Sequence, residues 1–299
     1  MQGQLQFRDI AGIIRLPFLL LAPVCIFLAA SLAIDDTGRI DSGTLSIILV
    51  CSVFAHIAVN ALNEYQDFRS GLDLSTQRTS FSGGSGTLPN KPGLAPVALG
   101  ISSIALAVTV VTGLVLVIQH GYALLLPGLI VVSLIILYTN VINRFPLLCL
   151  LSPGVGFGLV MVGGSYYVLT GDYNWQVFLV SLIPFFLSNN LLLLNQFPDV
   201  RADRDAGRNH VTIHYGYETG SRIYLLFLGL AALALVLSVA LGVLPSLSLA
   251  GLLLIAAGYP VYLAASRYGD DSDGLVPYMA RNVGMVLSMP VLIGATLYT

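Results

Sequence analysis

The chain has 299 residues, of which 56% are hydrophobic and only 9% are charged, with 13 Lys and Arg against 15 Asp and Glu. Because a soluble domain carries about 25% charged residues, this composition excludes a soluble globular protein, and the high hydrophobicity excludes a disordered one. The net charge of −2 provides no basic surface for nucleic acid. We therefore expect a polytopic membrane protein whose partner is the lipid bilayer.

Runs without Asp, Glu, Lys or Arg mark the segments that a bilayer accepts, because a helix needs about 20 apolar residues to cross it. Two of these runs, 92–143 and 223–266, have double length and break near Gly121 and Gly242. Strands of a membrane barrel would alternate in shorter segments of about ten residues, so the fold class is all-α. The sequence predicts one domain over 1–299 with nine transmembrane helices, at 15–34, 44–66, 95–118, 122–142, 147–170, 174–198, 219–242, 246–266 and 277–298.

The basic residues predict the orientation, because Lys and Arg collect in cytoplasmic loops. With the N-terminus in the cytoplasm, every Lys and Arg except Arg39 and Arg281 falls on the inner side, and the C-terminus lies on the opposite side. Arg281 lies inside the ninth predicted span, where we expect it to be buried beside an anionic or carbonyl partner. Two inner segments, about 67–94 and 199–218, are long and polar, which predicts functional cap loops at the cytoplasmic face.

Two helices bring oxygen-bearing side chains to this inner face. Asn63 and Asp67 share one face at the end of the second span, and Asn195, Asp199 and Asp203 are spaced four residues apart at the end of the sixth. Carboxylate and amide oxygens are the ligands that Mg²⁺ prefers, and Mg²⁺ binds together with substrate phosphates. The alternative is that these acids are solvated charges paired with nearby arginines, but each stripe opens with an Asn still inside an apolar run, where polar groups are costly.

The spacing of Asn63, Asp67 and Asp73, followed by Asp199, Asp203 and Gly207, resembles the two aspartate-rich motifs of the UbiA-type intramembrane prenyltransferases. The likeness covers nearly the whole chain and includes the segments Arg15-Leu16-Pro17, Tyr138-Thr139 and Tyr166-Tyr167. Within this superfamily the chain looks most like the branch that prenylates dihydroxynaphthoate in menaquinone synthesis.

The resemblance implies a ring of nine helices around an apolar cavity, with the motifs at its cytoplasmic mouth. It also implies Mg²⁺-dependent transfer of a prenyl group from a prenyl diphosphate donor to a hydrophobic, usually aromatic, acceptor. The chain departs from the family pattern at Glu64, where the menaquinone branch has Asp, at His210, where Thr is usual, and at Ile142, where Lys is usual. The acceptor type therefore stays open.

On this basis we assign expected roles to the site residues. Two Mg²⁺ ions are expected, one held by Asn63 and Asp67 and the other by Asp199 and Asp203, with Asn195 nearby, and they act as Lewis acids toward the leaving oxygens. Asp73 is the expected general base, and the rings of Tyr138, Tyr166 and Tyr167 are expected to stabilise an allylic cation. The residues expected to bind the diphosphate are Asn63, Arg78, Lys91, Arg144 and Arg208.

The glycine-rich segment Ser82–Gly86 has two interpretations, a lid whose backbone N–H groups face the diphosphate or a flexible linker. The function also has alternatives. One is the same chemistry on a non-aromatic or tetrapyrrole acceptor, and the other is a cation-coupled transporter. A transporter is expected to place its acids near the bilayer midplane, whereas here they cluster at helix ends.

Overall fold

The computed structural model describes residues 5–269 and 271–299, and over these residues the secondary structure is entirely helical. The chain begins with α1 (Phe7–Ile13), a 3₁₀ helix (Leu16–Leu20), α2 (Leu21–Thr37), α3 (Ser42–Ser70), α4 (Leu72–Ser75) and α5 (Thr87–Asn90). It continues with α6 (Ala95–His120), α7 (Leu125–Leu137), α8 (Pro146–Gly154), a π-helical segment (Val155–Gly164) and α9 (Ser165–Thr170). The remaining helices are α10 (Trp175–Asn195), α11 (Val200–Asp205), α12 (Val211–Ala240), α13 (Gly251–Ala256), α14 (Tyr259–Tyr268) and α15 (Ser272–Thr296).

The predicted membrane spans correspond to these helices one for one. Within the described residues, 8 segments are long and apolar enough to cross a membrane, and the fourth predicted span is a shorter apolar helix, Tyr122–Leu137. The prediction of an all-α, multi-pass membrane protein with about nine spans is therefore confirmed. The 8 long segments are Leu16–Thr37, Ser42–Ser70, Pro92–His120, Pro146–Thr170, Trp175–Asn195, Val211–Ala240, Ser246–Tyr268 and Asp273–Thr296.

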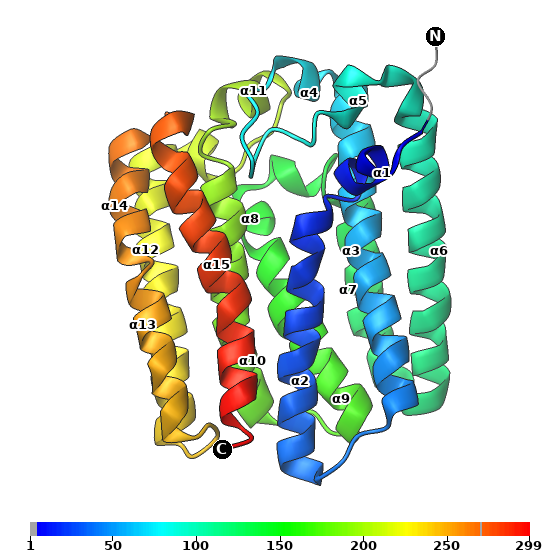
Figure 1. The fold of residues 1–299 in the computed structure, drawn as a ribbon, viewed down its shortest axis with the longest axis vertical. Helices are drawn as coiled ribbons and strands as arrows, with labels where there is room; N and C mark the ends of the chain where they lie inside the picture. The colour runs from blue at the N-terminus through cyan, green and yellow to red at the C-terminus, as the bar shows by residue number, and fades with distance from the viewer. Residues whose placement is uncertain (1–4, 270) are drawn as a thin grey trace.

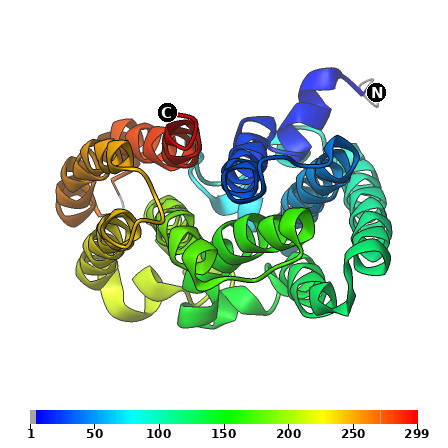
Figure 2. The same ribbon diagram turned by 90° about the horizontal axis from the view of Figure 1, so that it is seen from below.

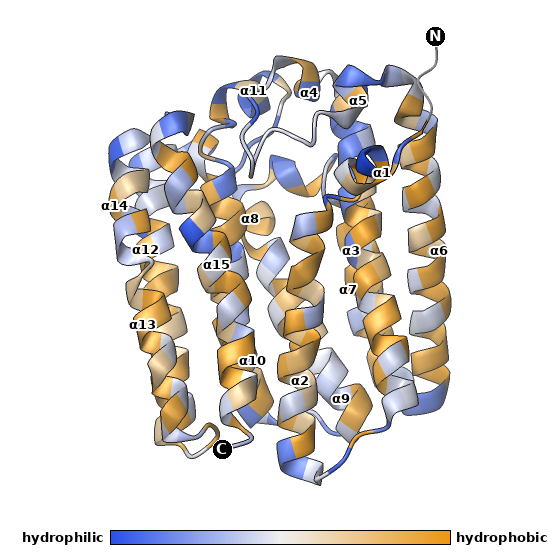
Figure 3. Cartoon of the chain, viewed as in Figure 1, coloured by the Kyte–Doolittle hydropathy of each residue, from blue (hydrophilic) through white to orange (hydrophobic). Residues whose placement is uncertain are grey.

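The long helices run side by side along the long axis of the molecule (Figure 1). Viewed along that axis, α12 to α15 form one side, α3, α6 and α7 form the other, and α2 and α8 to α10 lie between them (Figure 2). The largest apolar core joins α2, α10 and α12 to α15, and smaller cores lie between α3, α6 and α7. Hydrophobic residues cover the middle of the helices, whereas polar residues collect at the end that carries α4, α5 and α11, which we call the cap (Figure 3).

Local sequence signals determine where α3 begins and ends. Asp41 precedes α3, and its carboxylate accepts the Thr44 N–H at 2.6 Å, as an N-cap residue does. At the other end, Gly71 has a φ of 84°, a left-handed conformation that glycine adopts without strain. The chain therefore reverses at Gly71 and enters α4 in the cap.

Two glycines, Gly154 at the end of α8 and Gly158 in the π-helical segment, let this part of the chain approach α10 closely. A Cβ atom added at Gly158 would lie 2.6 Å from the Phe185 backbone nitrogen, and one added at Gly154 would lie 2.6 Å from the Phe185 carbonyl oxygen. Glycine at these two positions is therefore a packing requirement, as expected for close helix contacts in membranes.

We expect Gly158→Ala to destabilise the protein by about 1–3 kcal/mol, because the added methyl group overpacks a contact with rigid backbone. Gly163→Ala is the matched control, since its Cβ would meet its nearest neighbour, Ser181 Oγ, at an ordinary 3.6 Å. Thermal unfolding in detergent measures both variants, and equal melting temperatures would contradict the packing role.

The expectation for Arg281 is wrong. The residue lies on the exposed face of α15 instead of in the interior, and its guanidinium carbon stands 5.9 Å from the centre of the Tyr278 ring. Arg281 lies eight residues inside the Asp273–Thr296 span, and its long side chain lies at the protein surface over an aromatic neighbour, so it needs no buried anion.

Candidate active site

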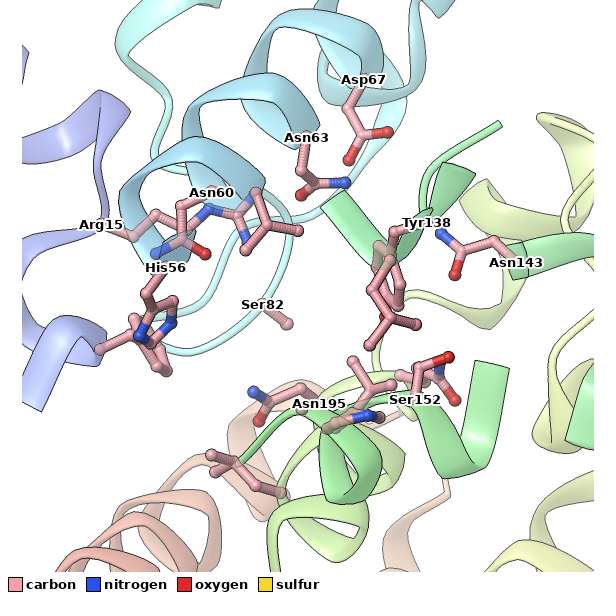
Figure 4. A pocket seen from close by; sticks show the side chains of 18 of the residues that line it. Arg15, His56, Asn60, Asn63, Asp67, Ser82, Tyr138, Asn143, Ser152 and Asn195 are labelled. Atoms are coloured by element: carbon pink, nitrogen blue, oxygen red, sulfur yellow. The ribbon is translucent and has the colours of Figure 1, made fainter. Parts of the chain in front are cut away.

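A cavity of about 280 Å³ lies beneath the cap, with polar side chains at its mouth and apolar side chains such as Phe157 and Met161 further from the cap. Figure 4 shows Asn63 and Asp67 of α3 across the cavity from Asn195, with Tyr138 between them. The cavity thus brings together site residues that lie far apart in the sequence. The predicted residues that line it are Asn63, Asp67, Asp73, Tyr138, Asn195, Asp199, Asp203 and Arg208.

The first acidic segment reaches the cavity from α3 and α4. Asn63 and Asp67 lie one turn apart on the face of α3 that lines the cavity. The Asn63 amide donates to Thr139 Oγ1 at 3.0 Å, which leaves its carbonyl oxygen available to a ligand. The reversal at Gly71 returns Asp73 to the same cavity, where it is only 2% exposed.

The second acidic segment differs from the predicted single helical stripe. Helix α10 ends at Asn195, and a turn containing Pro198 separates it from α11, which begins at Val200. Proline has no N–H to continue the helical hydrogen bonds, so a break at this position is expected. Asn195, Asp199 and Asp203 nevertheless all line the cavity, and the Asp203 N–H donates to the Asp199 carbonyl at 2.8 Å.

Arg208 joins the two segments directly. One guanidinium nitrogen donates to Asp203 Oδ1 at 2.9 Å, and the other forms an ion pair with Asp67 Oδ1. Burial lowers the pKa of Arg208, but the charges of Asp67 and Asp203 outweigh that effect and raise its pKa above the ordinary value. The carboxylates of α3 and α11 therefore converge within reach of a single cation.

The glycine-rich segment covers the cavity from above. Gly83 and Gly84 line it with positive φ angles of 77° and 74°, and the Gly83 N–H donates to Asp199 Oδ2 at 3.0 Å. A Cβ atom at Gly84 would lie 2.6 Å from Asp73 Oδ1, so only glycine fits against this carboxylate. The segment therefore lies over the cavity, and its Gly83 N–H is bound to a carboxylate. The choice between a diphosphate-binding lid and a linker stays a prediction.

The sequence model of the UbiA prenyltransferase family matches residues 23–284, which is most of the chain. The chain belongs to this family. Two curated relatives are both called 1,4-dihydroxy-2-naphthoate octaprenyltransferase. The Bacillus subtilis protein is 28% identical over 58% of this chain and 55% of its own length, and the Haemophilus influenzae protein is 29% identical over 36% of this chain and 35% of its own. The chain thus matches about half or less of the length of these relatives.

Solved structures share the fold. A UbiA homologue from Archaeoglobus fulgidus, bound to geranyl diphosphate (GPP) and Mg²⁺, superposes with a TM-score of 0.63 at 13% identity over 95% of this chain and 99% of that one. The apo structure of a UbiA homologue from Aeropyrum pernix K1 superposes with a TM-score of 0.66 at 15% identity over 94% of this chain and 97% of that one.

The cavity of this UbiA family member offers oxygen atoms of the kind that a Mg²⁺ ion needs. Four buried side-chain oxygens there have no hydrogen-bond partner: the Ser188 hydroxyl and, nearer the acidic segments, Asp73 Oδ2, Asn195 Oδ1 and Asp199 Oδ1. Across the described residues, no group of three or more His, Cys, Asp or Glu side chains forms a complete metal site. Mg²⁺ is commonly bound by one or two carboxylates and completes its ligands with substrate phosphates and water. The oxygen donors therefore fit a cation that arrives with a diphosphate.

Burial leaves two of these carboxyl groups poorly suited to carry an unpaired charge. Burial, and then the neighbouring charge of Glu64, raise the pKa of Asp73 to about 7. Burial, and then the charge of Asp203, raise the pKa of Asp199 to about 7. A positive ligand in the cavity would relieve both effects.

His210, the residue at which this chain departs from the family's usual Thr, binds the second acidic segment. Its Nε2 lies 2.9 Å from Asp203 Oδ2, and its Nδ1 lies 2.7 Å from Thr212 Oγ1. Arg208 and His210 thus occupy both carboxylate oxygens of Asp203, whereas Asp199 keeps one oxygen free. This difference between the two aspartates was not predicted, because it depends on the fold bringing His210 back onto α11.

Sequence reasoning missed the anchor that holds the glycine-rich segment. Glu64 is completely buried, accepts the Ser85 N–H at 3.2 Å and the Ser85 hydroxyl, and pairs with Arg15 at 3.3 Å. Arg15 has a left-handed φ of 51° and lines the cavity beside Asn60, whose amide donates to the Ile14 carbonyl at 3.0 Å (Figure 4). The available signal was a charged residue, Glu64, one position after a motif Asn inside a membrane helix.

Three of the predicted diphosphate ligands lie outside the wall of this cavity. Lys91 pairs with Asp9 of α1 at 2.7 Å, which joins α1 to the segment before α6. Arg78 is exposed and donates to the Asp73 backbone carbonyl at 3.2 Å, and Arg144 is exposed at the end of a 3₁₀ turn. The contacts of Lys91 and Arg78 favour roles in holding the cap, and none of the three side chains lines the cavity.

Tyr166 and Tyr167 do not meet the expectation for cation-stabilising rings. They lie in α9, at the end of the molecule opposite the cap (Figure 1). The Tyr166 hydroxyl donates to Asp36 at the end of α2, and the Tyr167 hydroxyl donates to the His120 carbonyl at the end of α6 at 3.2 Å. Of the three predicted tyrosines, only Tyr138 lines the cavity.

Proposed function

We propose that this protein transfers a prenyl group from a prenyl diphosphate to an aromatic acceptor of the dihydroxynaphthoate type, in a Mg²⁺-dependent reaction inside the membrane. The observation that carries the proposal is the contact of Arg208 with both acidic segments at the mouth of an apolar cavity. A prenyl diphosphate matches this arrangement, because its charged head would lie at the polar mouth and its apolar chain in the apolar part of the cavity. Family membership and the two naphthoate-prenylating relatives support this substrate class.

The head of the donor would bind at the cap. Arg208 and Arg15 are the cations that line the cavity, and both are partly exposed to it. Above them, Gly83 and Gly84 cover the head-group site, and the Gly83 N–H holds one oxygen of Asp199. Asn63, Asp67, Asp199 and Asn195 would hold Mg²⁺, with Asp203 fixed by Arg208 and His210 beside them.

The reaction would create a negative diphosphate, a positive prenyl carbon and a proton released by the acceptor ring. The cavity has groups suited to each of the three. Bound Mg²⁺ would act as a Lewis acid on the leaving diphosphate. The ring of Tyr138 lines the cavity between α3 and α10 and would stabilise the positive charge that develops on the prenyl carbon. Asp73, whose pKa is raised to about 7, is placed to accept the proton that the acceptor ring loses.

The distribution of basic residues indicates how the protein is oriented in the membrane. The cap carries Arg15, Arg69, Arg144 and Arg208, so the positive-inside tendency places it and the N-terminus in the cytoplasm. The last helix, α15, runs from the cap to the opposite end, which places the C-terminus on the other side of the membrane (Figure 1).

Chelation tests the metal requirement. We expect EDTA to stop diphosphate release by membranes that contain the protein, and excess Mg²⁺ to restore it, because the unpartnered carboxylates need a cation to face a diphosphate. Release that persists in EDTA would contradict the proposed chemistry at the head group.

Product analysis tests the function itself. Purified protein would be incubated with GPP and Mg²⁺ and with one acceptor at a time: a dihydroxynaphthoate, a hydroxybenzoate, a tetrapyrrole and a lipid alcohol. We expect mass spectrometry to detect a prenylated dihydroxynaphthoate. A product formed only from a tetrapyrrole or an alcohol would show that the acceptor is not a dihydroxynaphthoate. If no product formed and proteoliposomes showed ion flux, a transporter would be favoured.

A further inference from the structure

A second cavity, of about 240 Å³, adjoins the first on the side away from the cap. It lies between α3, α6, α7 and α9 and is lined by residues such as Ile48, Leu116, Leu124 and Val168. Ala55, Val131 and Met161 line both cavities, so the two share a wall made of small or flexible apolar side chains.

The second cavity lies where the prenyl chain of a bound donor would extend away from its diphosphate. On α3, Ala55 lies eight residues from Asn63, and Ile48 lies seven residues further on, toward the end opposite the cap. At a rise of about 1.5 Å per residue these steps correspond to ~12 Å and ~10 Å. The head-group site, the shared wall and the second cavity therefore follow one another along α3.

The chemistry of the second cavity matches a hydrocarbon. Aliphatic residues make up most of its lining, and two of its polar groups already have partners. The Thr109 hydroxyl donates to the Ala105 carbonyl at 2.9 Å, and the Cys51 thiol of α3 donates across to the Thr109 carbonyl of α6 at 3.6 Å. With these groups occupied, the cavity offers apolar surface to a ligand, and burying a chain of apolar units against it is favourable.

Two glycines keep this cavity open. A Cβ atom added at Gly113 on α6 or at Gly128 on α7 would meet nothing within 4 Å, although both residues line the cavity. Neither glycine is needed for a close helix approach. A larger side chain at either position would enter the cavity with little clash against its neighbours.

We propose that the second cavity binds the distal isoprene units of a long-chain prenyl diphosphate whose first units occupy the cavity beneath the cap. The proposal rests on the proposed function, and it adds that the chain turns toward α6 and α7 at the wall formed by Ala55, Val131 and Met161. A short donor ends before this wall, whereas a long donor crosses it. Residues that never contact the diphosphate would therefore determine how the affinity depends on donor length.

Filling the second cavity tests this inference. Gly128→Leu and Gly113→Leu would be compared with Gly100→Leu, a control on α6 whose Cβ also meets nothing within 4 Å but which lines neither cavity. Each purified variant would be assayed with GPP and with octaprenyl diphosphate, for turnover and for equilibrium binding of the radiolabelled donor.

We expect the two cavity variants to lose affinity and kcat/KM for octaprenyl diphosphate by about tenfold or more while keeping those for GPP within about twofold, because only the distal units lose buried contact. The control should match the wild type with both donors. GPP turnover in the same preparation shows that a variant is folded.

Three results would overturn the inference. Unchanged binding of octaprenyl diphosphate would mean that the cavity is filled by bilayer lipid. Equal losses for both donors would mean that the substitutions damage the whole site. Equal affinities of the wild type for the two donors would mean that the distal units are not bound. A wild type that binds the long donor more tightly but transfers no prenyl group would refute the proposed function alone, since the binding comparison still holds.

Discussion

The Asp199→Asn variant is expected to lose diphosphate release by a factor of about 100 to 1,000 or more, while remaining folded. Asp199 has one carboxylate oxygen bound to the Gly83 N–H and one buried oxygen without a partner. Asparagine keeps the size of the side chain and its bond to Gly83, but it removes the negative charge that would hold Mg²⁺ against the donor.

The control for this variant lies on α11, the short helix that follows Asp199. Asp205 is exposed at the end of α11, so Asp205→Asn removes one carboxylate charge six residues from Asp199 without touching the cavity. Steady-state release of inorganic diphosphate and thermal unfolding in detergent would be measured for both variants. Wild-type turnover by Asp199→Asn, or equal losses in the two variants, would remove Asp199 from the mechanism.

The Glu64→Gln variant is expected to lower the free energy of unfolding by about 3–5 kcal/mol, because it leaves Arg15 without its buried ionic partner. It should also raise the KM for the donor, since Glu64 holds Ser85 and thereby the glycine-rich segment that covers the cavity. Glu64→Asp keeps the charge and should recover part of both losses, limited by the shorter reach of its carboxylate.

Glu218→Gln provides the matched control. Glu218 also pairs with an arginine, Arg222, at 2.6 Å, but both side chains are more than 70% exposed, and such surface pairs contribute about 0–1 kcal/mol. Thermal unfolding and donor titrations would be compared across the three variants. If Glu64→Gln were no more destabilised than Glu218→Gln and kept the wild-type KM, the anchoring role would be refuted.

The sequence predicted the spans well because the bilayer imposes a simple rule on them. A helix that crosses the membrane must be long and apolar, and runs free of charge report that requirement directly. The ends of the helices were less predictable. Helix α10 stops at Asn195 because Pro198 interrupts the hydrogen bonds after it, and the predicted helix to residue 198 was too long.

The meeting of the acidic segments at one end of the molecule was also predictable, because both follow spans that end on the same side of the membrane. Helical spacing correctly placed Asn63 and Asp67 on one face of α3, but it does not apply across the break between Asn195 and Asp199. The partners of the acidic side chains were not predictable. Arg208, His210 and Ser85 reach the acids from segments whose positions depend on the complete fold. No local pattern distinguishes Arg208, which bridges both motifs, from Arg144, which lies exposed outside the cavity.

The error about Tyr166 and Tyr167 could have been avoided by counting how far along its span each tyrosine lies. The predicted fifth span begins at residue 147 on the cap side, so residue 166 lies about 28 Å along that helix, at the opposite end. Tyr138, by contrast, follows a span that ends at the cap, and it lines the cavity. The position of each tyrosine along its span therefore distinguishes the ring that faces the cavity from the two that do not.

The central claim is that both acidic segments bind one Mg²⁺-diphosphate head group. Equilibrium binding of radiolabelled GPP to the purified protein, with Mg²⁺ and with EDTA, tests it most directly in the wild type, Asp67→Asn, Asp199→Asn and the double variant. We predict binding that requires Mg²⁺, a large loss in each single variant, and a double variant hardly weaker than either, because the two segments act on the same ligand. Binding that survives in EDTA, or losses that simply add, would contradict a shared site.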